Sequence, residues 1–361
     1  MNKAEKPMSV MHVNDRLVIG GVATIILMLD RALFEINSQS IITIEDNEHS
    51  LRCNKNLLQI SFGLSGLRKF ITLIASIFPL KMLWKIAHEK KKGNKVILHL
   101  HSPYPTTAIA SVIASIFTRT PLVYSVHANR THLNCFYWRI ENLIIFFSRK
   151  VIFELNSSFR DYESICSRKK ISYIPFGVEK KNVNLKWKQT HNKVFTLIVA
   201  NRLDPNRMTD VFIRAFYAQY KKDTSHLIII GDGTDYNKLF QLVIELNICN
   251  AVTFLPPVDE VTLQEYFIKA DCLLTLSASG DVGMTGKIAA GIGMPLLTYE
   301  FDSYAEFPYQ ACTISDLANK ITWIRTLTTL DIDEIRKLII SKLSSSSSTM
   351  INSHIALYRN I

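Results

Sequence analysis

Short apolar runs alternate with longer segments of helical periodicity along most of the chain. This alternation is typical of βαβ units, in which buried parallel strands are connected through helices. In the first half, the pattern predicts strands at Ser9–Val13, Val96–Leu100 and Leu122–Val126, and helices at Val22–Leu33 and Pro105–Phe117. Shorter runs predict further strands at Ser40–Ile44, Leu57–Ile60, Val151–Glu154 and Ile171–Ile174.

A polar segment, Glu179–Asn192, separates this series from a second one and is expected to be a linker. Five further strands are predicted, at Val194–Ala200, His226–Ile230, Val252–Leu255, Cys272–Leu276 and Pro295–Tyr299. Helices are predicted at Thr209–Tyr220, Asp235–Leu246, Thr262–Ala270, Leu317–Thr329, Asp333–Leu343 and Met350–Tyr358. We therefore expect two α/β domains, residues 1–182 and 193–343, followed by a Ser-rich spacer and a closing helix in residues 344–361.

Length and composition agree with two globular domains. The chain has 361 residues, 48% of them hydrophobic, which is enough apolar material for two cores. The longest apolar runs, Phe70–Leu80 and Ala108–Phe117, are shorter than the ~20 residues of a membrane-spanning helix. No secretory signal is visible near Met1, and the six cysteines show no CxxC pair. These features predict a cytoplasmic protein with reduced, mostly buried thiols.

The net positive charge is confined to the first half of the chain. Residues 1–180 hold 24 Lys and Arg against 13 Asp and Glu, whereas residues 181–361 hold 18 of each. A basic half suits nucleic acid, an anionic membrane or an anionic substrate. The basic residues form no nucleic-acid recognition motif, so we do not expect nucleic acid as a partner.

Candidate chemistry lies in the turns that follow strands, because ligands of open parallel sheets bind beyond the carboxyl ends of the strands. Arg202 and Arg207 follow the strand Val194–Ala200, and a guanidinium group binds two oxygens of a diphosphate at once. Gly231 and Gly233 follow the next strand and allow a ligand to approach the backbone. Taken alone, each motif has a simpler explanation: two solvated surface arginines for the first motif and an ordinary turn for the second.

Two more glycine-containing turns suit a phosphate. The segment Ser277–Pro295 is rich in glycine and enters a helix near Thr285, where free backbone N–H groups would point at an anion, with Lys287 adding charge. Gly20 and Gly21 open the first helix in the same way. A flexible connector is the alternative for the first of these turns.

Three histidines stand near the ends of two successive strands. His99 and His101 belong to the segment VILHLHSP, and His127 belongs to LVYSVHA. Their spacing shows no metal site, and a structural role is the usual one for a lone histidine at a strand end.

Taken together and in order, these motifs resemble glycosyltransferase family four. The motifs are GGVATIILML, VILHLHSP, LVYSVHA, YIPFGVE, VANRLDPNR, IIIGDG, VTFLPPV, ADCLLTLSASG and AAGIGMP, from about Met8 to Pro295. The resemblance implies the GT-B fold, with two facing Rossmann-like domains and a C-terminal helix that returns to the first domain. It also implies retention of the anomeric configuration, a nucleotide-sugar donor and no metal or other cofactor.

The resemblance also assigns roles to residues. Arg202 and Arg207 match the basic residues that hold the donor diphosphate, with Gly20 and Gly21 in the glycine loop opposite. His127 matches the histidine near the reacting sugar carbon. The remaining donor-binding residues that the resemblance implies are Gly231, Gly233, Phe254 and Leu255 around the base, and Gly283, Met284 and Thr285 at the phosphates.

The sequence departs from the family at two glutamates. Gly280 and Ile288 occupy their positions, so neither can contact sugar or ribose through a polar side chain. Asp281, beside the first position, is the candidate replacement. These departures keep a non-catalytic relative open as an alternative, and a sugar-nucleotide epimerase is the alternative enzyme of the same fold.

A basic, apolar segment of the first half suggests a membrane surface. Apolar and aromatic residues in the predicted helix Phe70–His88 lie beside the lysine cluster Lys90–Lys95. Such a helix suits an anionic lipid surface, although a core helix with a solvated end explains the same pattern. Similar enzymes often use lipid-linked saccharide acceptors. We therefore expect a peripheral location on the inner face of the cytoplasmic membrane and a role in bacterial surface polysaccharide synthesis.

Overall fold

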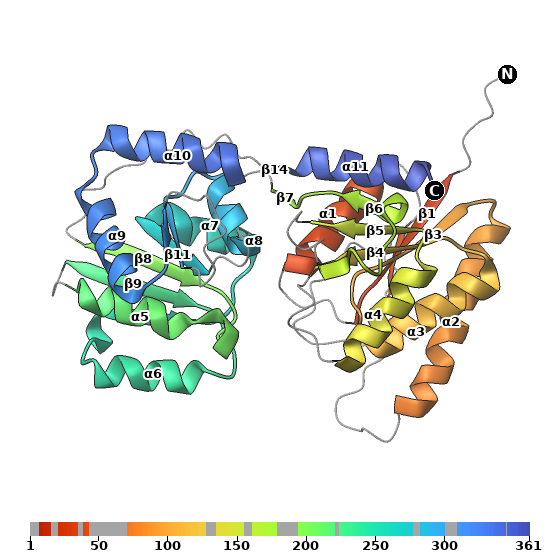
Figure 1. The fold of residues 1–361 in the computed structure, drawn as a ribbon, viewed down its shortest axis with the longest axis horizontal. Helices are drawn as coiled ribbons and strands as arrows, with labels where there is room; N and C mark the ends of the chain where they lie inside the picture. The colour runs from red at the N-terminus through yellow and green to blue at the C-terminus, as the bar shows by residue number, and fades with distance from the viewer. Residues whose placement is uncertain are drawn as a thin grey trace. The chain divides into compact units, whose positions relative to one another are not determined.

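Parallel sheets form the centre of both units of the chain (Figure 1). Unit 1 comprises Met1–Phe176 and Ser348–Ile361, and unit 2 comprises Gly177–Ser347. The computed structural model describes residues 7–15, 21–34, 39–42, 71–127, 135–154, 161–178, 194–220, 224–276, 282–299, 309–343 and 345–361. The expected linker Glu179–Asn192 and the expected strand Leu57–Ile60 lie outside the described residues.

In unit 1, the described strands form a six-stranded sheet in the order β2-β1-β3-β4-β5-β6. The strands are β1 (Met8–Val13), β2 (Gln39–Ile42), β3 (Lys95–Leu100), β4 (Leu122–Val126), β5 (Lys150–Phe153) and β6 (Ile171–Tyr173). The helices are α1 (Gly21–Phe34), α2 (Ile71–Lys91), α3 (Pro105–Thr118), α4 (Cys135–Phe147), η4 (Arg168–Lys170) and α11 (Ser347–Arg359). β2 lies on one side of β1, and the later strands follow one another from β3 on the other side of β1. The order in which strands are added therefore reverses between β1 and β3.

The two faces of this sheet differ in chemistry because successive side chains of a strand point to opposite faces. Leu98 and Leu100 of β3 belong to an apolar core with α2, α3 and α4, which lie together on one side (Figure 1). His99 points the other way and hydrogen-bonds Tyr358 of α11. The C-terminal helix therefore covers a face of the sheet that carries polar side chains.

In unit 2, the described strands of the larger sheet have the order β10-β9-β8-β11-β12-β13. They are β8 (Phe195–Ala200), β9 (Ser225–Ile230), β10 (Val252–Leu255), β11 (Cys272–Leu276), β12 (Leu296–Tyr299) and β13 (Gln310–Ala311). The helices are η5 (Pro205–Arg207), α5 (Thr209–Ala218), α6 (Tyr236–Glu245), η6 (Cys249–Ala251), α7 (Glu260–Lys269), α8 (Gly283–Gly291), α9 (Ile314–Thr326) and α10 (Thr329–Leu343). Counted along the chain this order is 3-2-1-4-5-6, the order of a doubly wound dinucleotide-binding sheet, with its switch point between β8 and β11.

Local sequence explains several of the element ends in unit 2. Asp259 caps α7 by accepting a hydrogen bond from the Thr262 backbone N–H at 2.8 Å, and Thr313 caps α9 by accepting one from the Asp316 N–H at 3.0 Å. The strands β8 and β9 are apolar on both faces and are buried between helix layers, as expected of parallel strands. A short parallel pair, β7 (Gly177–Val178) with β14 (Ser345–Ser346), lies at the start and end of this unit.

The expected α/β fold is confirmed, with parallel sheets and a C-terminal helix in the first unit. The main element that the sequence pattern missed is α4, whose apolar residues lie on all sides instead of forming one stripe. The thiols were expected to be mostly buried, but of the five described cysteines only Cys166 and Cys272 are buried. Among the described residues, no helix combines the length and apolarity needed to cross a membrane.

Candidate functional site

The turn that follows β8 presents two arginines. Leu203 is fully buried and anchors the turn, whereas Arg202 and Arg207 on either side of it are exposed. The Arg202 side chain is 77% exposed, and its Nε lies 2.9 Å from Asp204 Oδ2. This ion pair fixes one edge of the guanidinium group and leaves the terminal nitrogens on its other edge toward solvent.

A second turn, after β9, packs directly against the first. The Leu203 N–H donates to the Asp232 carbonyl at 2.9 Å, and the Asp235 N–H donates to the Leu203 carbonyl at 2.8 Å. A Cβ on Gly231 would lie 1.9 Å from the Asn201 carbonyl oxygen, and a Cβ on Gly233 would lie 2.4 Å from the Leu203 carbonyl oxygen. Only glycine permits this approach, so the two glycines hold the arginine turn in place.

The start of α8 lies at the other side of the switch point. Gly283 begins the helix at a φ of +63°, is exposed, and has no atom within 4 Å of where a Cβ would lie. Met284, Thr285 and Lys287 follow in the first turn and are half-buried. Because β8 and β11 are adjacent strands, the arginine turn and the segment leading into α8 leave the same edge of the sheet. This edge offers cationic side chains and free helical N–H groups.

The structure describes one of the two positions at which the family usually has a glutamate. Ile288 is only 6% exposed and belongs to the core of unit 2, so its side chain cannot reach a ligand. Gly280 and Asp281 lie outside the described residues, and the proposed replacement by Asp281 stays a prediction.

An aromatic group joins β10 to α6, beside the glycine turn. The Phe254 ring is 5.4 Å from the Tyr236 ring and 5.9 Å from the Phe240 ring. The Leu255 carbonyl accepts a hydrogen bond from the Gly231 N–H at 3.0 Å. The residues expected around a nucleotide base are therefore neighbours in space, and they adjoin the turn that holds the arginines.

His127, at the end of β4 in unit 1, has both ring nitrogens engaged. Its Nδ1 lies 2.7 Å from Glu154 Oε1, and its Nε2 lies 3.0 Å from His101 Nδ1. A carboxylate accepts only, so His127 carries its proton on Nδ1 when neutral. Glu154 follows β5 and was not singled out from the sequence. Gly21 begins α1 in the same unit, and Gly20 lies outside the described residues.

The same sheet face carries a buried histidine layer, formed by His12, His99, His101 and His354. His12 Nδ1 lies 3.0 Å from His101 Nε2, and the rings of His99 and His101 are 4.0 Å apart. Burial lowers the pKa of His12 to about 3 and that of His354 to about 4, and it lowers the pKa of His99 and His101 as well. Sequence spacing did not predict this layer, because the β1–β3 register and α11 assemble it.

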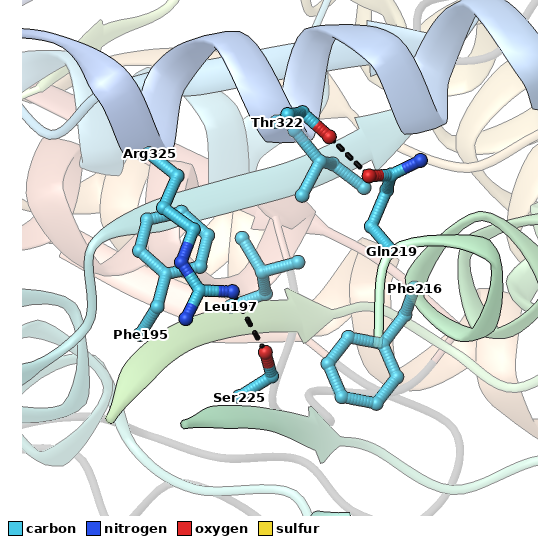
Figure 2. A pocket seen from close by; sticks show the side chains of 8 residues that line it. Phe195, Leu197, Phe216, Gln219, Ser225, Thr322 and Arg325 are labelled. Atoms are coloured by element: carbon cyan, nitrogen blue, oxygen red, sulfur yellow. Dashed lines mark hydrogen bonds between the residues drawn. The ribbon is translucent and has the colours of Figure 1, made fainter. Parts of the chain in front are cut away.

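A small cavity in unit 2 is remote from this chemistry. It lies at the amino ends of β8 and β9 and has a volume of about 20 Å³, enough for one water molecule (Figure 2). Arg325 closes it, since its guanidinium donates to Ser225 Oγ and to the Thr224 carbonyl, both at 3.0 Å. The cavity therefore lies where Arg325 fixes α9 to the sheet, and it is too small for a substrate.

Comparison with known proteins agrees with the fold. Residues 182–307 match the family described as Glycosyl transferases group 1. The chain is 25% identical over 257 residues to the Campylobacter jejuni GalNAc-alpha-(1->4)-GalNAc-alpha-(1->3)-diNAcBac-PP-undecaprenol alpha-1,4-N-acetyl-D-galactosaminyltransferase, covering 70% of this chain and 69% of that protein.

Solved structures with the same fold include two bacterial proteins. The Anabaena protein HepE in complex with UDP and glucose has a TM-score of 0.78 and 18% identity, over 98% of this chain and 100% of that one. A glycosyltransferase from Rickettsia africae has a TM-score of 0.70 and 14% identity, over 98% of both chains. At these identities the likeness concerns the fold.

Proposed function

Because the chain is a group 1 glycosyltransferase with the GT-B fold, we propose that it transfers a sugar from a UDP-sugar to a lipid-linked saccharide with retention of configuration. The observation that carries this proposal is the arginine turn, held by Gly231 and Gly233 beside the start of α8 at the switch point of unit 2. That combination is suited to a nucleoside diphosphate.

The charges of the site suggest the mechanism. As the bond to the leaving diphosphate breaks, negative charge grows on the phosphate oxygens while the sugar becomes oxocarbenium-like. Arg202, Arg207 and the N–H groups at Gly283–Thr285 stabilise this charge where it develops, which lowers the barrier to transfer. With these groups neutralising the leaving group, the transfer step needs no divalent metal.

His127 is the proposed catalytic residue of unit 1. With Nδ1 held by Glu154 and Nε2 held by His101, its ring is fixed in one orientation. We assign it the role of a fixed dipole beside the sugar, because a free base would need an unengaged ring nitrogen.

The choice of donor and acceptor rests on the relatives. The HepE structure binds UDP, which favours uridine as the base, and the Campylobacter enzyme is an N-acetylgalactosaminyltransferase that uses an undecaprenol-linked acceptor. We therefore propose a hexose or N-acetylhexosamine as the sugar, a polyprenol-linked saccharide as the acceptor, and surface polysaccharide synthesis on the cytoplasmic side as the setting.

A lipid-linked acceptor requires access to a membrane, and unit 1 has a suitable surface. Its helices α2, α3 and α4 expose Leu80, Trp84, Phe117, Phe136 and Phe146, with Phe117 77% exposed and Phe146 73% exposed. Exposed Lys91, Arg119 and Arg139 lie on or directly after the same three helices. Apolar rings among cations are typical of binding to anionic lipid.

Vesicle flotation tests the membrane location. Wild type is expected to float with anionic vesicles and to stay behind with zwitterionic ones, whereas Phe117→Ser/Phe146→Ser should lose most of the binding. Trp323→Ser removes an exposed aromatic residue from unit 2 and is the control. Equal flotation of the double variant and wild type would contradict lipid binding by this surface.

A transfer assay tests the activity itself. The protein is incubated with a panel of UDP-sugars and a polyprenyl-diphosphate-linked saccharide, and the product linkage is read by NMR. An elongated product with the donor's anomeric configuration is expected, and Arg202→Ala or Arg207→Ala should lower the rate by about 10²–10³-fold. Binding of UDP without any turnover would instead favour a non-catalytic relative. The burial of Ile288, at a position where the family usually has a glutamate, supports that alternative. Conversion of a UDP-sugar in the absence of acceptor would indicate an epimerase.

A further inference from the structure

The histidine layer of unit 1 contains a group of ring nitrogens close enough to share one cation. His12 on β1, with His99 and His101 on and directly after β3, offer one ligand atom each, and these atoms lie within 4.8 Å of one another. All three side chains are buried, and β1 and β3 pair with His12 directly opposite His99. The group is therefore built into the centre of the sheet, at the point where the strand order reverses.

Glu154 sets the direction of the hydrogen bonds that lead into this group. With His127 neutral, Glu154 accepts from its Nδ1, and its Nε2 accepts from His101 Nδ1. His101 Nε2 then carries a lone pair toward His12, at 3.0 Å from His12 Nδ1. A carboxylate that orients a histidine ligand through hydrogen bonds is a recurrent arrangement around protein-bound metals.

His12 ends this chain of hydrogen bonds with an unsatisfied atom. Its Nδ1 donates to His101, so its Nε2 carries a lone pair, and this buried atom has no hydrogen-bond partner within the described part of the chain. Leaving a buried polar atom unpaired is costly, so such an atom indicates a missing partner. A cation is a partner that accepts lone pairs from several neutral imidazoles at once.

We propose that His12, His99 and His101 bind one divalent transition-metal ion, of which zinc is the best match to a set of neutral imidazoles. Two imidazole nitrogens on one zinc ion at 2.0–2.1 Å lie about 3.3 Å apart, and the ligand atoms of the three histidines lie within 4.8 Å of one another, so small ring movements bring them onto one ion. His99 must exchange one hydroxyl contact for the metal, since its nitrogens lie 2.6 Å from Tyr358 Oη and 2.8 Å from Ser125 Oγ. The ion would connect β1 to β3 and stabilise unit 1, and it does not depend on the proposed transfer reaction.

Metal titration of the full chain tests this proposal. Protein freed of metal with a chelator is titrated with Co²⁺, whose visible absorption reports ligand number, and then with Zn²⁺. We expect one ion per chain, a tetrahedral cobalt spectrum, displacement by zinc, and loss of all three in His12→Gln/His101→Gln. His88→Gln removes an exposed histidine of α2 in the same unit and should bind as wild type does.

A second measurement covers the case in which the double variant does not fold. Zn²⁺ at about 100 times its dissociation constant should raise the melting temperature of wild type by roughly 5–10 °C, whereas Mg²⁺ should not. No metal uptake, uptake that the folded double variant retains, or a wild type whose melting temperature ignores Zn²⁺ would each overturn the proposal. In those cases the layer is satisfied by hydrogen bonds alone.

Discussion

At the scale of the residue, Glu154 decides how the His127 ring is held. The 2.7 Å contact fixes the proton on Nδ1 and the orientation of the ring. Glu154→Ala should therefore lower kcat by about 10–100-fold while the affinity for UDP stays unchanged, because the proposed nucleotide residues lie in unit 2. Steady-state kinetics measure the effect, with exposed Glu163→Ala as the control. A weakened UDP affinity with an unchanged kcat would contradict the role given to this pair.

Asp30 on α1 is a second residue whose environment makes a prediction. Burial raises the pKa of its carboxyl group to about 6 from 3.8, and its side chain is nearly inaccessible. Between pH 4 and pH 6 the unfolded chain loses this proton while the folded chain keeps it, so the folded state loses stability as the pH rises. Above pH 6 the full cost is present.

Asp30→Asn removes this cost. The variant should be more stable than wild type by about 1–2 kcal/mol at pH 7.5 and about equal to it at pH 4. The value at pH 7.5 is set below the full free-energy equivalent of the pKa shift. Urea denaturation at both pH values measures the difference, and exposed Asp161→Asn is the control. A variant that is less stable than wild type at pH 7.5 would show that the Asp30 carboxylate is stabilised by its neighbours.

At the scale of the element, the two turns after β8 and β9 act as one structure. Gly231 has a φ of +151°, and a Cβ there would overlap the Asn201 carbonyl oxygen. Gly231→Ala should therefore cost about 3 kcal/mol or more in the stability of unit 2 and weaken UDP binding. Gly93→Ala, at a φ of +85° with no atom within 4 Å, should cost only about 1 kcal/mol. Thermal denaturation measures both losses of stability. If the two variants lose similar amounts, the two turns can separate.

The elements themselves were largely predictable, whereas their side-chain contacts were not. Strands such as β8 and β9 are apolar on both faces and could be recognised from the sequence, and the glycines of the two turns mark where backbones approach. The helix α4 was missed because its apolar residues do not form one stripe. The contact between His12 and His101 depends on a strand register across 89 residues, which no local pattern encodes.

At the scale of the whole molecule, the two units divide the chemistry between them. Unit 1 holds the basic excess, the exposed aromatic helices and the histidine layer, while unit 2 holds the arginine turn and the start of α8. We propose on this basis that unit 1 binds the acceptor near lipid and that unit 2, which has little net charge, binds the donor. The role of each unit rests on the donor site, because without nucleotide binding no transfer is possible.

Isothermal titration calorimetry with UDP tests that site most directly. Wild type should bind UDP in preference to GDP and ADP, and Arg202→Ala and Arg207→Ala should each raise the Kd by about 10–100-fold, the value of a charge-assisted hydrogen bond. Exposed Arg214→Ala on α5 removes the same charge from the same unit and should leave the Kd unchanged. Absence of UDP binding, or a Kd that neither substitution in the turn alters, would contradict the account.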